Sequence, residues 1–234
     1  LPFVSGERAL RIERERITEW GFSWEVQPGA YAIDDFDFKK PSVELLQQTR
    51  HKRDYAEAEH EIYDYPGEYD SKGEGEAYVR IRLEELQSQV QIMQGAGNAR
   101  GIATGCVFEL EEQPREDQNR KYLITASRLD FVLAAHEAGG GEGASFRSSF
   151  DCIASDLPFR TQRTTRKPLV QGLQTAIVVG PAGDEIYTDE YGRVKVHFHW
   201  DRHGKDDENA SCWIRVSHPW AGKNFGMVAM PRIG

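Results

Sequence analysis

Three histidines stand close together in the last third of the sequence, and their spacing resembles that of a metal site. His197 and His199 lie two residues apart in a run that alternates apolar and polar side chains. Residues at that spacing on a β-strand point to the same side, and His203 follows soon after, so the three rings suit an open zinc site. The same spacing arises when the wet face of a strand carries imidazoles, and no fourth protein ligand is placed. We therefore expect no metal and no cofactor.

Other patterns that carry catalysis are also missing from the sequence. The pair His136-Glu137 lacks the second histidine of a zinc-protease helix, because Gly140 occupies that position. No Gly-x-Ser-x-Gly elbow is present. The glycine-rich run 139–143 lacks a Gly-Lys-Ser/Thr ending, so we interpret it as a hairpin connection. The acidic run Asp34–Asp37 lacks the ligand spacing of a calcium loop and predicts a turn. We predict no catalytic residues and no enzymatic activity in this chain.

Composition and charge narrow the class of partner. The chain has 234 residues, 39% of them hydrophobic, a net charge of −9 and a pI near 5.3. No apolar run approaches the ~20 residues that span a bilayer. The first residues form no signal peptide, and the missing initiator Met predicts a fragment at that end. An acidic chain repels phosphates, so nucleic acid is not an expected partner.

Cys106, Cys152 and Cys212 are predicted to be buried free thiols of a protein folded in a reducing cytoplasm.

The histidines lie on the clearest predicted strand of the chain. From Val194 to Trp200 apolar and polar side chains alternate, which is typical of a half-buried strand. Residues 189–192 predict a turn before it, and the charged run 201–210 predicts a solvated loop after it. A second strand is predicted at 212–217. Short strands joined by glycine- and proline-rich turns indicate a small closed or partly closed barrel.

One amphipathic helix is predicted among the strands of the first two thirds. Its apolar side chains recur at spacings near 3.6 over residues 74–90, and Arg82, Glu84 and Glu85 are expected on a solvated face. Residues 160–168 are polar, basic and poor in apolar side chains, as in a linker between domains. Further strands are predicted at residues 9–27, 31–38, 106–110, 121–132, 145–154 and 170–179. The expected fold class is therefore mainly β with some α.

Five blocks near the end of the chain resemble one family. They are Tyr191–Val196, Phe198–Arg202, Ser211–Val216, Trp220–Gly222 and Pro231–Gly234. These blocks are similar to VgrG, the spike protein of the bacterial type VI secretion system, which is itself similar to the hub and spike proteins of contractile phage tails. The residues that carry the resemblance, in a structural role, are Tyr191, Gly192, Arg193, Val194, Phe198, Trp200, Asp201, Arg202, Trp213, Arg215, Trp220, Gly222, Pro231, Arg232 and Gly234.

The resemblance implies an architecture. Residues 169–234 would form an OB-fold β-barrel, truncated before a β-helical needle. Residues 1–160 would be the C-terminal part of a phage-tail-hub-like β-rich region, and residues 161–168 the linker. Trp200, Trp213 and Trp220 are candidate anchors for the barrel core or for subunit contact, with the core favoured.

The resemblance also implies a role. The chain would be part of a homotrimeric puncturing spike that sits on an Hcp-type tube protein and carries a PAAR-type tip or effector proteins. It would assemble in the bacterial cytoplasm and then pass transiently through membranes into a target cell. Two alternatives stay open: a phage-like tail spike or hub protein that bears a cell-wall hydrolase beyond this stretch, and a generic OB module for nucleic acid or sugar. Residues 168–234 hold 7 basic and 8 acidic side chains, which disfavours nucleic acid.

Overall fold

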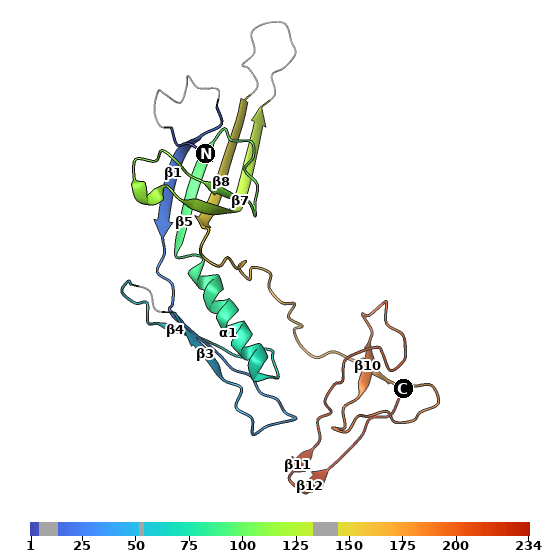
Figure 1. Ribbon diagram of the computed structural model, residues 1–234. Coiled ribbons are helices and arrows are strands. Elements are labelled where there is room, and N and C mark those ends of the chain that lie inside the picture. Colours follow the sequence, from blue (N-terminus) through green and yellow to red (C-terminus); the bar gives the residue numbers. More distant parts are fainter. Residues whose placement is uncertain (5–13, 52–53, 133–144) are drawn as a thin grey trace, which may run out of the picture. The chain divides into compact units, whose positions relative to one another are not determined.

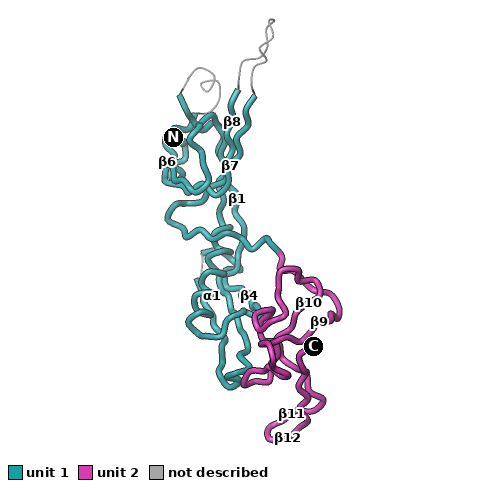
Figure 2. The backbone as a smooth tube through the Cα atoms, turned by 90° about the vertical axis from the view of Figure 1, so that its right-hand side faces the viewer, with its two compact units in different colours: residues 1–165 teal, residues 166–234 magenta. Residues whose placement is uncertain are grey.

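The computed structural model describes residues 1–4, 14–51, 54–132 and 145–234. The glycine-rich run 139–143 and the pair His136-Glu137 lie outside these ranges. The chain divides into two compact units, Leu1–Thr165 and Arg166–Gly234, which Figure 2 shows in different colours. Each unit is described by itself. Strands outnumber helices throughout, so the predicted class, mainly β with some α, is confirmed.

A five-stranded antiparallel sheet forms the first part of unit 1 (Figure 1). Its order is β1 (Ile17–Trp24), β5 (Gln91–Gly97), β8 (Ser145–Ala154), β7 (Lys121–Val132) and β6 (Val107–Glu109). The predicted strands at 121–132 and 145–154 are confirmed, because alternating side chains let one face of each strand enter the core. Of the strand predicted at 9–27, residues 9–13 lie outside the described ranges and residues 17–24 form β1.

The core of this sheet is aromatic and sulfur-rich. Met93, Tyr122 and Cys152 are fully buried, and the Trp20 ring packs edge-on against Tyr122 with centroids 4.9 Å apart. Gly95 on β5 lies under the Phe150 ring, where an added Cβ would come within 2.4 Å of the ring. Glycine is therefore required at this position for the ring to lie on the sheet.

A smaller three-stranded sheet and one α-helix complete unit 1. The strand order is β3 (Gln47–Arg50), β2 (Ala30–Ile33) and β4 (Glu61–Asp64), and α1 (Lys72–Gln87) packs on β2 and β3 (Figure 1). The helix predicted at 74–90 is confirmed in kind, but it begins two residues earlier and ends three residues earlier. The helix begins after Ser71, whose hydroxyl accepts a hydrogen bond from the Glu74 N–H at 3.4 Å, and it ends before Val90, which is buried in the following turn. The structure describes no helix long and apolar enough to cross a membrane.

Unit 2 contains two short antiparallel ladders. β9 (Ala176–Val179) pairs with β10 (Lys195–Phe198), and β11 (Trp220–Gly222) pairs with β12 (Phe225–Met227). The strand predicted at 212–217 is wrong in extent, because only Ile214 pairs, through an isolated bridge to Val194. The strand predicted from 170 begins at Ala176.

The cysteines only partly follow the sequence prediction. All three are free thiols, but Cys106 and Cys212 are exposed and only Cys152 is buried. Burial raises the pKa of the Cys152 thiol well above its ordinary value. The prediction of three buried thiols is wrong for the other two. Cys106 directly precedes β6 and Cys212 lies in irregular chain before the isolated bridge at Ile214, so neither occupies a buried strand position.

Candidate functional site

The first block of unit 2, Tyr191–Val196, is held together by a turn built on Asp189. The Asp189 carboxylate accepts hydrogen bonds from the backbone N–H groups of Tyr191 (3.0 Å) and Arg193 (2.9 Å), and it forms an ion pair with the Arg193 guanidinium at 2.6 Å. Gly192 supplies the positive φ of 66° that the turn needs. Burial alone would raise the pKa of Asp189, but the hydrogen bonds from Arg193 and Tyr191 outweigh it, so the pKa lies below its usual value.

The strand that follows forms the small core of unit 2. Val194 and Val196 are buried, and Val194 exchanges two backbone hydrogen bonds with Ile214 at 2.9 and 2.8 Å. Ser211 reinforces the contact, because its hydroxyl accepts from the Val196 N–H at 3.0 Å while its carbonyl accepts from Lys195 Nζ at 2.6 Å. The third block thus lies directly against the first.

The end of the chain returns to the same ladder. Arg232 contacts the Glu185 carboxylate, and the Gly234 N–H donates to the Val178 carbonyl on β9 at 3.0 Å. Gly234 has a φ of 92°, which favours glycine. Pro231 precedes these contacts and is half-buried. The structure therefore brings together the first, third and last blocks of the family resemblance.

The aromatic residues of unit 2 are less buried than predicted. Trp200 stacks on Phe198 with centroids 5.2 Å apart, yet 66% of its surface is exposed, and Trp220 is 69% exposed. The interpretation of these two tryptophans as core residues of the single chain is wrong. Trp213 is half-buried and packs on Tyr187 at 5.2 Å. The remaining resemblance residues, Arg202, Arg215 and Gly222, are exposed.

The three histidines do not gather around one point. His197 Nδ1 contacts the Asp206 carboxylate at 2.5 Å, and its Nε2 contacts the Asp201 carbonyl at 2.9 Å. Both ring nitrogens therefore face protein acceptors and neither offers a lone pair to a metal. Within the described ranges no group of three or more histidine, cysteine or acidic side chains is placed to hold a metal ion.

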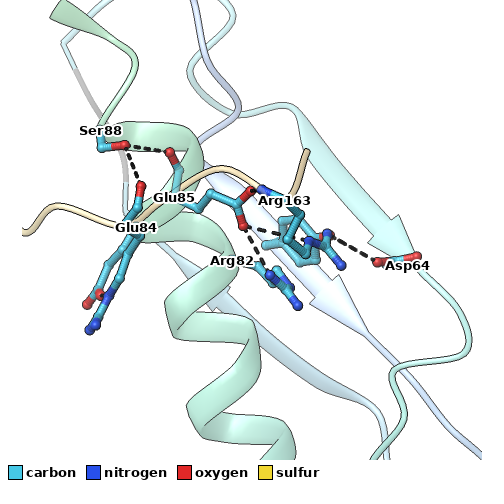
Figure 3. A network of polar contacts seen from close by, with 8 residues as sticks. Asp64, Arg82, Glu84, Glu85, Ser88 and Arg163 are labelled. Carbon is cyan, nitrogen blue, oxygen red and sulfur yellow. Dashed lines mark hydrogen bonds and ion pairs between the residues drawn. The ribbon is translucent and has the colours of Figure 1, made fainter. Parts of the chain in front are cut away.

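A second site lies in unit 1, where the sequence predicted a solvated helix face and a polar, basic linker. Figure 3 shows the carboxylate of Glu85 on α1 surrounded by basic groups. Glu85 accepts from the Arg163 backbone N–H at 2.8 Å and from Arg82 Nη1 at 3.1 Å, and its side chain is only 13% exposed. Arg160 donates to Glu84 at 2.7 Å. The prediction of a solvated face is therefore wrong for Glu84 and Glu85, because Arg160 and Arg163 hydrogen-bond to them.

We call this segment, residues 160–163, the strap. The Ser88 hydroxyl donates to the Glu85 carbonyl at 2.8 Å and lies 3.5 Å from the Arg160 carbonyl, and Arg163 Nη2 lies 3.7 Å from Asp64 on β4 (Figure 3). The signal that could have indicated the strap is the opposite charge of the two segments, but nothing local pairs residues so far apart in the sequence.

Comparison with known proteins gives a consistent result for both units. Residues 1–134 match the family described as "Phage tail baseplate hub (GPD)", and residues 175–234 match the "Type VI secretion system/phage-baseplate injector OB domain". The two matches define the class: proteins in which a phage tail baseplate hub region is followed by an injector OB domain. The chain belongs to the phage tail baseplate hub family.

Curated relatives narrow the class further. The chain is 48% identical over 223 residues to the type VI secretion system spike protein VgrG1b of Pseudomonas aeruginosa, covering 95% of this chain and 30% of the relative. It is 34% identical to VgrG3 of Vibrio cholerae, covering 93% and 22%, and 36% identical to the actin cross-linking toxin VgrG1 of the same species, covering 86% and 19%. The chain is thus a member of the VgrG spike family, and it spans about a fifth to a third of the length of these relatives.

Proposed function

We propose that this chain is the structural hub and barrel portion of a type VI secretion puncturing spike. In this proposal three copies associate, sit on an Hcp-type tube protein and present a PAAR-type tip or effectors. The spike assembles in the bacterial cytoplasm, and the tube drives it through membranes into the target cell. Residues 1–160 act as the hub region, 161–168 as the linker and 169–234 as the OB barrel.

One observation carries the proposal. A baseplate hub match and an injector OB match follow each other in one chain, and relatives named as spike proteins align over 95% of it. A fold alone says little about function, but this ordered pair occurs together with close identity to named spike proteins.

The distribution of apolar side chains in unit 2 supports association. Its buried apolar side chains are three valines, at 179, 194 and 196, whereas eleven large apolar side chains are exposed. A domain of this size with so small a core gains stability by covering its apolar surface against other chains. The exposed residues are Leu169, Val170, Leu173, Ile177, Ile186, Tyr191, Trp200, Trp220, Phe225, Met227 and Val228.

The proposal assigns a structural role, and no catalysis, to the residues that carry the family resemblance. Their polar groups are used in holding turns and strand ends, as at Asp189–Arg193 and Arg232–Glu185. One relative is named an actin cross-linking toxin, and this chain aligns to 19% of that protein. We therefore assign any effector activity to other parts of such proteins.

The test uses the full-length protein in the bacterium that encodes it. Deletion of the gene is expected to abolish release of the Hcp-type protein into the medium, and the wild-type gene is expected to restore it. Native mass spectrometry of the purified full-length protein is expected to give three chains per particle. Release of the tube protein without this gene would refute the proposal.

The alternative, a tail spike with a cell-wall hydrolase beyond this stretch, is separated by a second assay. The 234-residue chain is expected to leave peptidoglycan intact. Turnover of peptidoglycan by this chain would contradict the structural assignment, whereas turnover by the full-length protein alone would favour the alternative.

A further inference from the structure

His197 ties strand β10 to the charged loop 201–210, and no catalytic or metal-binding role explains its two contacts. One ring nitrogen meets the Asp206 carboxylate at 2.5 Å and the other meets the Asp201 carbonyl at 2.9 Å. We propose that this arrangement is a proton-operated staple, which holds the loop closed on β10 while the imidazole is charged and releases it when the proton is lost.

The chemistry of the two partners fixes the protonation state of the closed form. A carboxylate and a backbone carbonyl are both acceptors, so each ring nitrogen must donate an N–H. Only the imidazolium form carries two N–H groups, while the neutral ring carries one. After loss of a proton, one of the two contacts becomes a repulsion between lone pairs. The staple therefore holds at both ends only in the charged form.

The loop has little else to hold it against the strand. Apart from the two staple contacts, the described hydrogen bonds of residues 203–210 stay within the loop. The Asp201 carboxylate accepts from the N–H groups of His203 and Gly204 at 3.0 Å each, and the other bonds join residues 205–210 to one another. Gly204 packs against the staple, since a Cβ there would lie 3.0 Å from His197 Nε2 and 2.5 Å from the Asp201 carboxylate. Opening the staple thus frees residues 203–210 from β10.

The charges around the ring favour its charged form. Asp206 and Asp201 face it from the loop, which also carries His203. On its own strand, Lys195 is held by the Ser211 carbonyl. His199 lies just past the end of β10, and the facing residue on β9 is the apolar Ile177. The hydrogen bond to Asp206, followed by the one to the Asp201 backbone, raises the pKa of His197 above the ordinary 6.5. The stabilisation is therefore complete below the ordinary pKa and is lost as pH rises through the raised one.

Limited trypsin digestion of the full chain reads the loop directly, because Arg202 and Lys205 are cleavage sites within it. The wild type and His197→Gln are compared at the same pH, so the protease's own pH dependence cancels. At about pH 6 we expect the variant to be cleaved in the loop about five- to tenfold faster, because its closed state is less populated. At about pH 9 the two rates are expected to converge. The proposal is overturned if the ratio of the variant's cleavage rate to that of the wild type stays constant across pH, or equals one at about pH 6.

Two matched variants complete the test. His199→Gln removes an imidazole two residues away, just past the end of β10, and is expected to leave the ratio of the cleavage rates unchanged. Asp206→Asn keeps the ring but removes the facing charge, so loop opening is expected at a lower pH than in the wild type. NMR of the histidine ring carbons follows the same step and is expected to show His197 titrating above the ordinary histidine pKa of 6.5. A His197 midpoint that Asp206→Asn does not lower contradicts the staple.

Discussion

Replacement of Glu85 by Ala is expected to destabilise unit 1 more than any other single change in the strap network. The reason lies in the donors that meet this carboxylate. It accepts from the Arg163 backbone N–H at 2.8 Å and from Arg82 at 3.1 Å, with its side chain only 13% exposed. Hydrogen bonds to a charged group contribute about 1.5–3 kcal/mol when they are shielded from water, so we expect Glu85→Ala to cost about 2 kcal/mol.

The partner side chain is expected to matter much less. The Arg163 side chain is 51% exposed, and its contacts with Glu85 and Asp64 are 3.7 Å long. Exposed ion pairs of this kind contribute about 0–1 kcal/mol, so Arg163→Ala is expected to cost about 0.5 kcal/mol. That variant keeps the backbone N–H of residue 163, which makes the shorter of the two contacts between Arg163 and Glu85. The double variant is expected to show a coupling energy of about 0.5 kcal/mol.

The assay is urea unfolding, monitored by hydrogen exchange of peptides from α1. These peptides report on unit 1 separately from unit 2. Glu84→Ala is the matched control, because Glu84 is the neighbouring acid on the same helix and pairs with the 42% exposed side chain of Arg160. Its expected cost is about 0.5 kcal/mol. The reasoning is refuted if Glu85→Ala costs no more than Glu84→Ala, or if Arg163→Ala costs as much as Glu85→Ala.

Three further outcomes follow from individual side chains. Gly95→Ala is expected to cost about 1–3 kcal/mol in thermal or urea unfolding, because the new methyl group overlaps the ring packed on it, and an unchanged stability would contradict this. In a thiol-labelling assay Cys106 and Cys212 are expected to react in the folded chain, while Cys152 reacts only after unfolding because burial raises its pKa; equal rates would be the contrary result. Trp220→Ala is expected to weaken the proposed association of the full-length protein about tenfold or more in light scattering, as loss of a large exposed aromatic anchor does, while leaving the unfolding of unit 1 unchanged.

The alternation of apolar and polar side chains predicted those strands whose side chains alternate between the core and the solvent. The strands at 121–132 and 145–154 were predictable because one face of each contributes side chains to a shared core, so the period of two is written into the sequence. The helix was predictable in kind but not in bounds. Its apolar spacing continues to Val90, whereas the cap at Ser71 and the turn after Gln87 set its ends.

The candidate sites were less predictable, because they depend on partners far apart in the sequence. Glu85 and Arg163 are 78 positions apart, and their contact uses a backbone N–H that no residue type signals. The spacing of the histidines gave no sign of the partners of His197, because Asp206 and the Asp201 carbonyl meet its ring only in the folded chain. The exposure of Trp200 was hidden because the alternation continued past the end of β10.

The two units are stabilised in different ways, and the difference fits the proposed spike. Unit 1 has aromatic and aliphatic cores on two sheets, whereas unit 2 holds its shape chiefly through polar contacts such as Asp189–Arg193 and Ser211 with Val196. Such contacts fix the geometry of turns and strand ends but contribute little net free energy when partly exposed. Beyond three buried valines, eleven large apolar side chains of unit 2 are exposed, where the neighbouring chains of the proposed spike can cover them. In the proposed spike, a barrel built in this way would gain most of its rigidity on assembly, because the surface that a single copy leaves in water would become the interior of the oligomer.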